Sequence, residues 1–223
     1  MIKAVIFDMD GTALDSMGHG EGNLIEYLKV LGVEFTDKEL KALRNIGWND
    51  IVDYVNEIKG TSFERKAFRD GIIETHMEKY KRGYKLMPGF IKFLDFLETR
   101  NIKFCIATAT RSYGAEAVFE RFGLMDKIEF IITEGTVGYT KNFPQIYLEA
   151  ARRLGADVSE TVVFEDALYA IKTAKKAGFT TVAVREPFYE SDHVEIEENS
   201  DLIIEDFNEL LELIKNNKTD IFN

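Results

Sequence analysis

Residues 2–12 read IKAVIFDMDGT, and this stretch decides the fold. Its first six residues are almost all apolar and include β-branched side chains, which predicts a short buried strand. Asp8, Asp10 and Gly11 follow at once and predict a tight turn at the carboxyl end of that strand. A strand that is apolar on both faces cannot cover itself, so it belongs inside a larger sheet. The remaining chain must supply the neighbouring strands and the helices that cover them.

From residue 85 onward, the hydrophobic pattern alternates between strand-like and helix-like segments. Strands are predicted at 103–107, 129–132, 161–164, 180–184 and 201–204. Helices are predicted between and around them, at 89–99, 115–122, 144–154, 167–177 and 207–215. This alternation is typical of a parallel sheet with helices on both faces. We therefore predict the α/β fold class, with a doubly wound, Rossmann-like parallel sheet that includes the first strand.

Residues 16–84 interrupt that alternation directly after the first strand. They show almost no strand pattern, and helical periodicity is found at 23–31, 36–44, 49–58 and 63–81. Residues 87–89, Met-Pro-Gly, mark the return to the sheet, because proline and glycine break regular structure. The sequence thus predicts two domains: a catalytic α/β core of residues 1–15 and 85–223, and a small all-helical cap of residues 16–84. The polar tail at 216–220 is expected to fray.

Composition and charge narrow the classes of function. The chain has 223 residues, with 39 acidic and 28 basic side chains and a net charge of −11. Nucleic-acid binding requires a basic surface, and binding to anionic membranes requires a basic amphipathic face, so both are disfavoured. No stretch approaches the roughly 20 apolar residues of a membrane-spanning helix, and the N-terminus has no signal-peptide pattern. Cys105 is the only cysteine, which excludes an internal disulfide. We therefore expect a cytoplasmic protein, and a monomer because nothing in the sequence argues for assembly.

Polar side chains follow several of the predicted strands at the point where each strand ends. In open α/β sheets, ligands bind beyond the carboxyl ends of the strands, where such side chains meet. The polar residues at these ends are Asp8, Asp10, Thr108, Thr110, Arg111, Lys141, Glu165 and Asp166. Four strand ends thus bring acids, hydroxyls and cations to one edge of the sheet.

This set of side chains suits phosphoryl transfer. A carboxylate can attack phosphorus and form an aspartyl phosphate, and a second acid can give and take a proton at the leaving oxygen. Several carboxylates held close together repel one another, so a divalent cation is needed. Oxygen ligands with open positions for water and phosphate favour Mg²⁺. The cation and a lysine can then neutralise charge on the transferring phosphoryl oxygens.

Four short motifs, in order along the chain, resemble those of the haloacid dehalogenase-like hydrolase superfamily. They are DMDGT at 8–12, Thr108, Lys141 and the pair Glu165-Asp166. The helical insert is similar to the cap of the group that contains β-phosphoglucomutase and phosphoglycolate phosphatase, and the resemblance covers nearly the whole chain. The third motif departs from the usual Lys-Pro-x-Pro-Asp, since it reads KNFPQ at 141–145. The fourth departs from Glu-Asp-Ser-x-x-Gly, since it reads EDALYA at 165–170, but neither change removes a charged catalytic group.

The resemblance implies a role for each matched acid and for the lysine. Asp8 would be the nucleophile and a Mg²⁺ ligand. Asp10 would be the general acid and base, with its backbone carbonyl on the metal. Lys141 would pair with the phosphoryl group and with Asp8. Asp166 would be a further metal ligand, with Glu165 beside it as part of the metal site.

Substrate contacts are implied by the same resemblance or by position. Thr108 and the backbone amide of Ala109 would hold the phosphoryl group, and Arg111 matches a position that reaches a distal group of the substrate in some relatives. His19 begins the insert close to the acids and is a candidate substrate-binding residue. Arg44 opens the sequence RNIGW, which either projects a substrate-reading loop or forms an ordinary turn between helices; the sequence leaves both open.

The function expected from these motifs is Mg²⁺-dependent hydrolysis of a small phosphorylated metabolite, a phosphate monoester. Asp10 argues against dehalogenases, which lack the second acid, and against phosphonoacetaldehyde hydrolases, which carry alanine at that position. One alternative stays open within the family, a phosphomutase of the β-phosphoglucomutase type. An alternative of another class is a non-catalytic phosphate-binding protein on the same fold, against which the intact set of acids argues.

Overall fold

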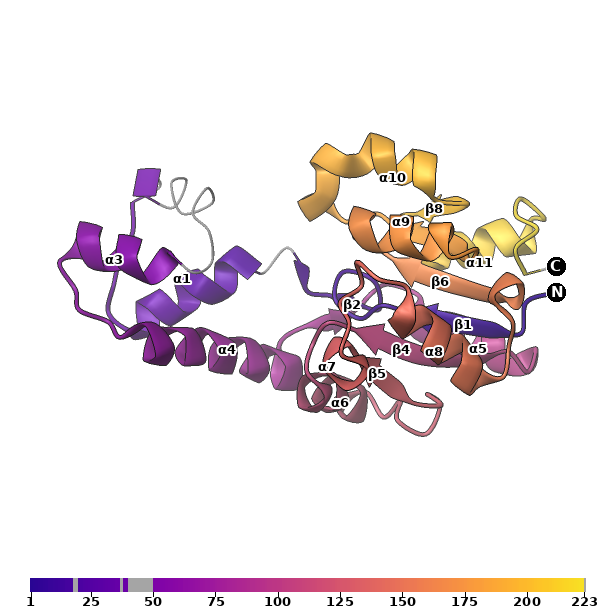
Figure 1. Ribbon diagram of the computed structural model, residues 1–223, viewed down its shortest axis with the longest axis horizontal. Helices are drawn as coiled ribbons and strands as arrows, with labels where there is room; N and C mark the ends of the chain where they lie inside the picture. Colours follow the sequence, from indigo (N-terminus) through magenta and orange to yellow (C-terminus); the bar gives the residue numbers. More distant parts are fainter. Residues whose placement is uncertain (18–19, 37, 40–49, 223) are drawn as a thin grey trace. The chain divides into compact units, whose positions relative to one another are not determined.

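The computed structural model of the chain describes residues 1–17, 20–36, 38–39 and 50–222 (Figure 1). It divides into two compact units, the first made of Met1–Met17 and Tyr84–Asn223 and the second of Gly18–Gly83. The sequence prediction placed the divisions after residue 15 and before residue 85. The assignment of the first unit as catalytic core and of the second as cap stays a prediction.

The first unit is built on a six-stranded parallel sheet. Its strand order is β5-β4-β1-β6-β7-β8. The strands are β1 (Ala4–Phe7), β4 (Lys103–Thr108), β5 (Ile131–Thr133), β6 (Thr161–Glu165), β7 (Thr180–Val184) and β8 (Leu202–Ile204). Because β1 pairs with β4 on one side and β6 on the other, the predicted doubly wound α/β fold is confirmed, with the first strand at its centre.

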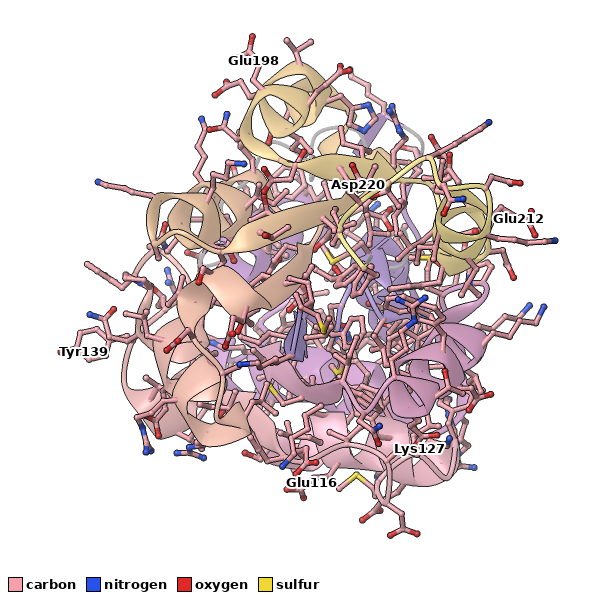
Figure 2. All side chains as sticks on the ribbon, turned by 90° about the vertical axis from the view of Figure 1, so that its right-hand side faces the viewer. Glu116, Lys127, Tyr139, Glu198, Glu212 and Asp220 are labelled. Atoms are coloured by element: carbon pink, nitrogen blue, oxygen red, sulfur yellow. The ribbon has the colours of Figure 1, made fainter. Side chains whose placement is uncertain are left out.

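Helices cover both faces of this sheet (Figure 1). They are α5 (Phe90–Thr99), α6 (Ser112–Arg121), α7 (Glu134–Val137), α8 (Gln145–Leu154), α9 (Leu168–Lys176), α10 (His193–Asn199) and α11 (Phe207–Lys215), with 3₁₀ turns at Val158–Glu160 and Pro187–Asp192. Figure 2 shows the charged ends of Glu198 on α10 and Glu212 on α11 pointing away from the sheet. The helices α5, α8 and α11 bury apolar side chains and are amphipathic, with their apolar faces toward the strands.

Alternate residues of β1 pack on opposite faces, as the two-residue period of a strand requires. Ala4 and Ile6 lie in the core cluster that contains the apolar face of α8. Phe7 packs on the other face, where its ring centroid lies 5.1 Å from that of Phe90 and 5.9 Å from that of Phe207. Burial on both faces fixes this strand, and with it the position of the acids that follow.

A buried phenylalanine lies at the far end of the polar tail. Phe222 is 4% exposed, and its ring centroid lies 5.5 Å from that of Phe93 on α5. Its carbonyl oxygen accepts a hydrogen bond from the guanidinium of Arg100. The prediction considered only the polar residues 216–220, and their fraying stays a prediction, although the apolar residue beyond them packs against α5.

A short antiparallel pair stands where the chain leaves and re-enters the first unit. It consists of β2 (Leu14–Asp15) and β3 (Lys85–Leu86). Strands of two residues have no readable period, so the sequence did not predict them. The helix α10 was also not predicted, because Ile196 is its single buried residue and the helix carries no apolar stripe.

The second unit has helices joined by turns and loops, and no strand, in its described residues. Its helices are α1 (Gly20–Val30), α3 (Ile51–Lys59) and α4 (Arg65–Arg82). Of the helix predicted at 36–44, only residues 36, 38 and 39 are described. The amide of Thr36 donates to Oε2 of Glu39 at 2.7 Å, and the amide of Glu39 donates to Oγ1 of Thr36 at 3.4 Å, the reciprocal bonds of a helix start. Across the described parts of both units, no helix has the length and apolar character needed to cross a bilayer.

We expect Phe222→Ala to lower the free energy of unfolding by about 3 kcal/mol, because it leaves a cavity against Phe93. Urea unfolding followed by circular dichroism measures this difference. Lys218→Ala, at an exposed position of the same tail, is the matched control and should change stability little. Equal stability of the two variants would show that the tail does not anchor the unit.

Candidate active site

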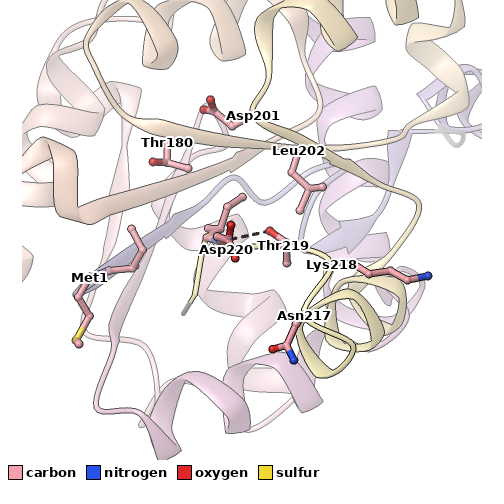
Figure 3. A pocket seen from close by; sticks show the side chains of 10 residues that line it. Met1, Thr180, Asp201, Leu202, Asn217, Lys218, Thr219 and Asp220 are labelled. Atoms are coloured by element: carbon pink, nitrogen blue, oxygen red, sulfur yellow. Dashed lines mark hydrogen bonds between the residues drawn. The ribbon is translucent and has the colours of Figure 1, made fainter.

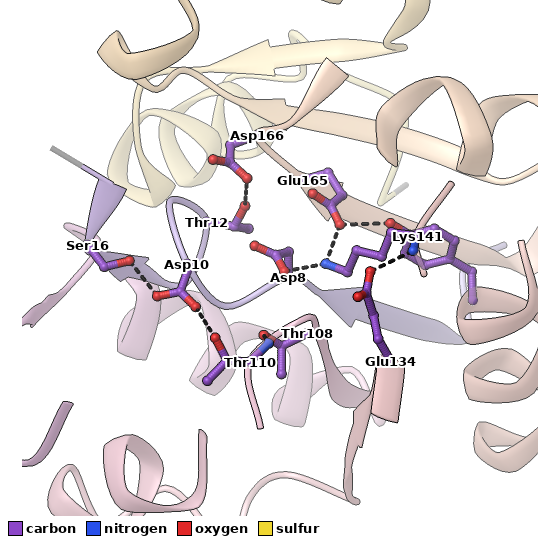
Figure 4. A network of polar contacts seen from close by, with 11 residues as sticks. Asp8, Asp10, Thr12, Ser16, Thr108, Thr110, Glu134, Lys141, Glu165 and Asp166 are labelled. Carbon is purple, nitrogen blue, oxygen red and sulfur yellow. Dashed lines mark hydrogen bonds and ion pairs between the residues drawn. The ribbon is translucent and has the colours of Figure 1, made fainter. Parts of the chain in front are cut away.

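The site begins at Asp8, the first residue after β1 (Figure 4). Its backbone amide donates to the carbonyl oxygen of Phe164 at 2.9 Å, which continues the parallel ladder past the end of the strand. Asp8 is therefore fixed beside the last residue of β6, Glu165, and the residue after it, Asp166. All three carboxylates are buried, with at most 6% of each residue exposed.

A glycine turn follows Asp8 and packs against the carboxylate of Asp166. Gly11 has a φ of +81°, a conformation that other residues adopt only with strain. A Cβ atom at this position would lie 2.1 Å from Oδ2 of Asp166. Position 11 thus requires glycine for two reasons: its backbone has a positive φ, and the carboxylate of Asp166 lies too close for a Cβ atom.

Lys141 lies between two of the buried carboxylates. Its ammonium donates to Oδ1 of Asp8 and, at 2.6 Å, to Oε1 of Glu165. The backbone amide of Lys141 donates to Oε1 of Glu134 at 2.7 Å, and Glu134 is the first residue of α7. The bond between the Lys141 amide and Glu134 holds the loop that carries the lysine. The loop follows β5, which lies on the far side of β4 from β1, and from there the buried side chain reaches the end of β1.

Burial controls the charge of this cluster. Burial raises the pKa of Asp8 to about 8, although the Lys141 ammonium opposes the effect. Burial also raises the pKa of Asp166 well above its usual value, and the charge of Asp8 adds to this shift. For Lys141, burial alone would lower the pKa, but the carboxylates of Asp8 and Glu165 outweigh it and raise the pKa. The lysine is thus charged, while one ammonium cannot compensate three carboxylates.

The same three acids fit a divalent cation. Asp8, Glu165 and Asp166 each offer a carboxylate oxygen, and these oxygens lie within 4.8 Å of one another. Oδ1 of Asp166 accepts from the hydroxyl of Thr12 at 3.4 Å, whereas its buried Oδ2 has no hydrogen-bond partner. A buried carboxylate oxygen without a partner is costly, and a cation would satisfy it. A donor set made only of oxygens suits a hard cation such as Mg²⁺ or Ca²⁺.

Asp10 is held apart from this cluster by two hydroxyl groups. Its Oδ1 accepts from Oγ of Ser16 at 2.6 Å, and its Oδ2 accepts from Oγ1 of Thr110 at 2.8 Å. A hydroxyl can donate or accept, so both can serve Asp10 whether its carboxyl carries a proton or not. The sequence placed Thr110 at a strand end but gave no partner for Asp10, and Ser16 was missed because its approach depends on the β2 turn.

The residues predicted to contact the substrate differ in burial and in hydrogen bonding. The hydroxyl of Thr108 is buried and accepts from the backbone amide of Thr110 at 3.0 Å. Ala109 lies exposed in the loop after β4. Arg111 is the exposed N-cap residue of α6, and its guanidinium pairs with no residue in the described part of the chain. His19 and Arg44 lie outside the described residues.

Tyr147 is a member of the network that the sequence analysis missed. Its hydroxyl donates to Oε1 of Glu165 at 2.7 Å. Tyr147 lies on the buried face of α8, where an aromatic ring fits the packing pattern. A polar hydroxyl on an otherwise apolar face requires a buried partner, and this signal was present six residues after Lys141.

A separate hollow of about 620 Å³ lies where β1, β7 and β8 begin (Figure 3). Met1, Thr180, Leu202 and the tail segment line it. No predicted site residue contributes to it. The predicted site residues of the first unit lie at the opposite, carboxyl edge of the sheet.

Several known proteins are similar to this chain in sequence over most of its length. Residues 2–178 match the family of haloacid dehalogenase-like hydrolases. Hexitol phosphatase B of Escherichia coli (strain K12) is 26% identical over 195 residues, which cover 86% of this chain and 87% of that protein. Beta-phosphoglucomutase of Bacillus subtilis (strain 168) is 26% identical over 221 residues, covering 92% of this chain and 93% of that protein.

Two further similarities concern a longer protein and a solved structure. Protein SUPPRESSOR OF QUENCHING 1, chloroplastic, of Arabidopsis thaliana is 27% identical over 190 residues, which are 82% of this chain but only 18% of that protein. A crystal structure of a Thermotoga maritima protein has a TM-score of 0.83 at 23% identity, and the match covers 96% of this chain and 99% of that one. At this identity the structure shows a shared fold. Because the family match spans β1 through α9, and so includes every motif at the carboxyl edge of the sheet, the chain belongs to the haloacid dehalogenase-like hydrolases.

Proposed function

We propose that the chain is a Mg²⁺-dependent phosphatase that hydrolyses a small-molecule phosphate monoester through an aspartyl phosphate on Asp8. One observation carries the proposal: the buried Lys141 ammonium bridges Asp8 and Glu165, beside an oxygen of Asp166 that has no partner. A carboxylate fixed at a strand end by a cation on one oxygen keeps its other oxygen available to attack phosphorus.

The cation would be held by Asp8, Glu165 and Asp166, with the backbone carbonyl of Asp10 as a further ligand. When bound, Mg²⁺ supplies positive charge that neutralises the phosphoryl oxygens and relieves the repulsion among the carboxylates. Lys141 supplies a second positive charge in contact with Asp8. Thr108 and the amide of Ala109 would donate hydrogen bonds to the phosphoryl group.

The reaction would run in two displacements on phosphorus. In the first, a carboxylate oxygen of Asp8 forms a bond to phosphorus while the ester P–O bond breaks, and Asp10 gives its proton to the leaving alcohol. In the second, Asp10 takes a proton from water as the water oxygen bonds to phosphorus. The bond from Asp8 to phosphorus then breaks, which releases inorganic phosphate and restores the Asp8 carboxylate.

The substrate would be a small phosphorylated metabolite with a polar body. Arg111, exposed and without a partner in the described part of the chain, is suited to an anionic or hydroxyl-rich distal group. His19 and Arg44 remain candidate contacts from the insert. The similarity to hexitol phosphatase B supports a phosphorylated polyol or sugar as the first class to screen.

A phosphomutase is the second candidate, because the similarity to beta-phosphoglucomutase covers nearly the whole of both chains. A mutase would return the phosphoryl group from Asp8 to a sugar rather than to water. Incubation with a hexose phosphate and a bisphosphate activator separates the two reactions. Isomerised sugar phosphate would favour the mutase, and free phosphate the phosphatase.

Asp8→Asn should reduce phosphate release by at least about 10³-fold, because an amide oxygen cannot replace the attacking carboxylate. The measurement is phosphate release from a panel of sugar and polyol phosphates, with Mg²⁺ and with EDTA. Asp126→Asn, which changes an exposed acid of the same unit, should retain full activity. If no ester in the panel is hydrolysed by the unmodified protein, the non-catalytic alternative is favoured.

Stabilisation by Mg²⁺ should increase with pH. Burial places the pKa of Asp8 at about 8 in the folded chain, above its value in the unfolded chain. The stability that this proton contributes is therefore present at low pH and is lost as the pH rises through about 8. Mg²⁺ competes with the same proton, so the rise in melting temperature on adding Mg²⁺ should be larger at about pH 8.5 than at about pH 6.5.

Thermal melts in EDTA and in excess Mg²⁺, at constant ionic strength, measure this difference. A Mg²⁺ effect of equal size at both pH values would contradict the assignment of Asp8 to the cation site. Added NaCl of the same ionic strength controls for screening, which should not depend on pH in this way.

A further inference from the structure

The phenol hydroxyl of Tyr147 belongs to the acidic network but has no role in the proposed reaction. The ring is fully buried in the core cluster beneath the sheet, and its centroid lies 6.2 Å from that of Phe179 in an edge-to-face contact. The ring therefore has one fixed position. From there the hydroxyl reaches the carboxylate of Glu165 at 2.7 Å.

Two donors converge on the same oxygen of Glu165. Oε1 accepts from the Tyr147 hydroxyl and also from the Lys141 ammonium, at 2.6 Å. Within the described part of the chain, no hydrogen bond reaches Oε2 of Glu165. Asp8 shows the same division, since Lys141 donates to its Oδ1 alone. Each of these carboxylates thus has one oxygen held by the protein and one left for another partner.

Lys141 alone is a poor anchor for Glu165. Its ammonium is shared with Asp8, and a phosphoryl group would draw on it further, because a lysine ammonium has only three donors. Lysine is a flexible point charge, whereas the Tyr147 ring is fully buried and packs edge-to-face with Phe179. Burial raises the pKa of Tyr147, so its hydroxyl keeps the proton that it donates. Tyr147 therefore supplies the fixed donor of the pair.

We infer that Tyr147 is a positioning residue for the cation site: its hydroxyl holds Oε1 of Glu165 against Lys141 and leaves Oε2 for the divalent cation. This inference rests on the proposed function, because it assigns Glu165 to the cation. Partners that orient a metal ligand typically contribute about 10-fold to 100-fold in metal affinity. Loss of the hydroxyl should therefore weaken Mg²⁺ binding without removing any ligand.

Tyr147→Phe removes the hydroxyl and keeps the packed ring. Calorimetric titration with Mg²⁺, in the absence of substrate, should give a dissociation constant at least about 10-fold higher than that of the unmodified protein. At saturating Mg²⁺, KM for the phosphate ester should stay within about twofold, because Tyr147 does not reach the substrate. Unchanged Mg²⁺ affinity in a folded variant would overturn the inference.

A second buried tyrosine of the same unit provides the matched control. Tyr84 is 4% exposed and takes no part in the hydrogen bonds of Glu165 and Lys141 described above. Tyr84→Phe should bind Mg²⁺ as the unmodified protein does. An equal loss of Mg²⁺ affinity in both variants would overturn the inference, because it would indicate a general destabilisation of the unit. Tyr147→Leu, which also lacks the hydroxyl, gives the same test if the phenylalanine variant does not fold.

The outcomes separate this inference from the proposed function. Normal Mg²⁺ affinity of Tyr147→Phe, together with an inactive Asp8→Asn, would overturn the role of Tyr147 and leave the phosphatase standing. Absence of any Mg²⁺ binding by the unmodified protein would overturn both. Weaker Mg²⁺ binding by Tyr147→Phe, with an unaffected Tyr84→Phe, would support the inference.

Discussion

The rest of the site depends on the incomplete neutralisation of three buried carboxylates by one ammonium. Asp8, Glu165 and Asp166 are withdrawn from water at the carboxyl edge of the sheet, and Lys141 contacts the first two. Burying a charge without a partner is expensive, so such a cluster takes up protons or a cation. A divalent cation would complete it in charge, and the oxygen of Asp166 without a hydrogen-bond partner is suited to accept it.

The register of the parallel sheet brings these acids together, although they are far apart in the sequence. Phe7, the last residue of β1, is paired with Ile106 on one side and with Phe164 on the other, so β4 ends two residues and β6 one residue beyond this level. Asp8 then lies next to Glu165, although the two residues are 157 positions apart in the sequence. Burial of both faces of β1 prevents a shift of register, because a one-residue slip would exchange its two packed faces. Rigid strands thus place the acids, and a loop anchored by Glu134 brings the lysine.

The hydrophobic period and the order of the motifs predicted the elements of the sheet and the acids at its edge. Hydrogen-bond partners that depend on the exact placement of side chains were not predicted. The alternation after residue 85 predicted the sheet, and the order of the acids predicted which residues meet at its edge. The partners of Asp10 could not be read in the same way, because Ser16 approaches through a two-residue strand that has no period. Tyr147 was hidden for a different reason: a tyrosine on an apolar helix face satisfies the packing pattern, so its hydroxyl drew no attention.

Gly11 shows how closely turn geometry and chemistry are joined in this chain. A glycine after two aspartates is explained by a turn with positive φ, and that explanation alone would allow asparagine. The space at this position excludes it, since any Cβ would meet the carboxylate of Asp166 at 2.1 Å. The first motif therefore sets the position of an acid from the fourth motif, and Thr12, the next residue, donates its hydroxyl to the same carboxylate. The first and fourth motifs, separate in sequence, are thus packed together, and the turn after β1 would shape the proposed cation site as directly as the ligands would.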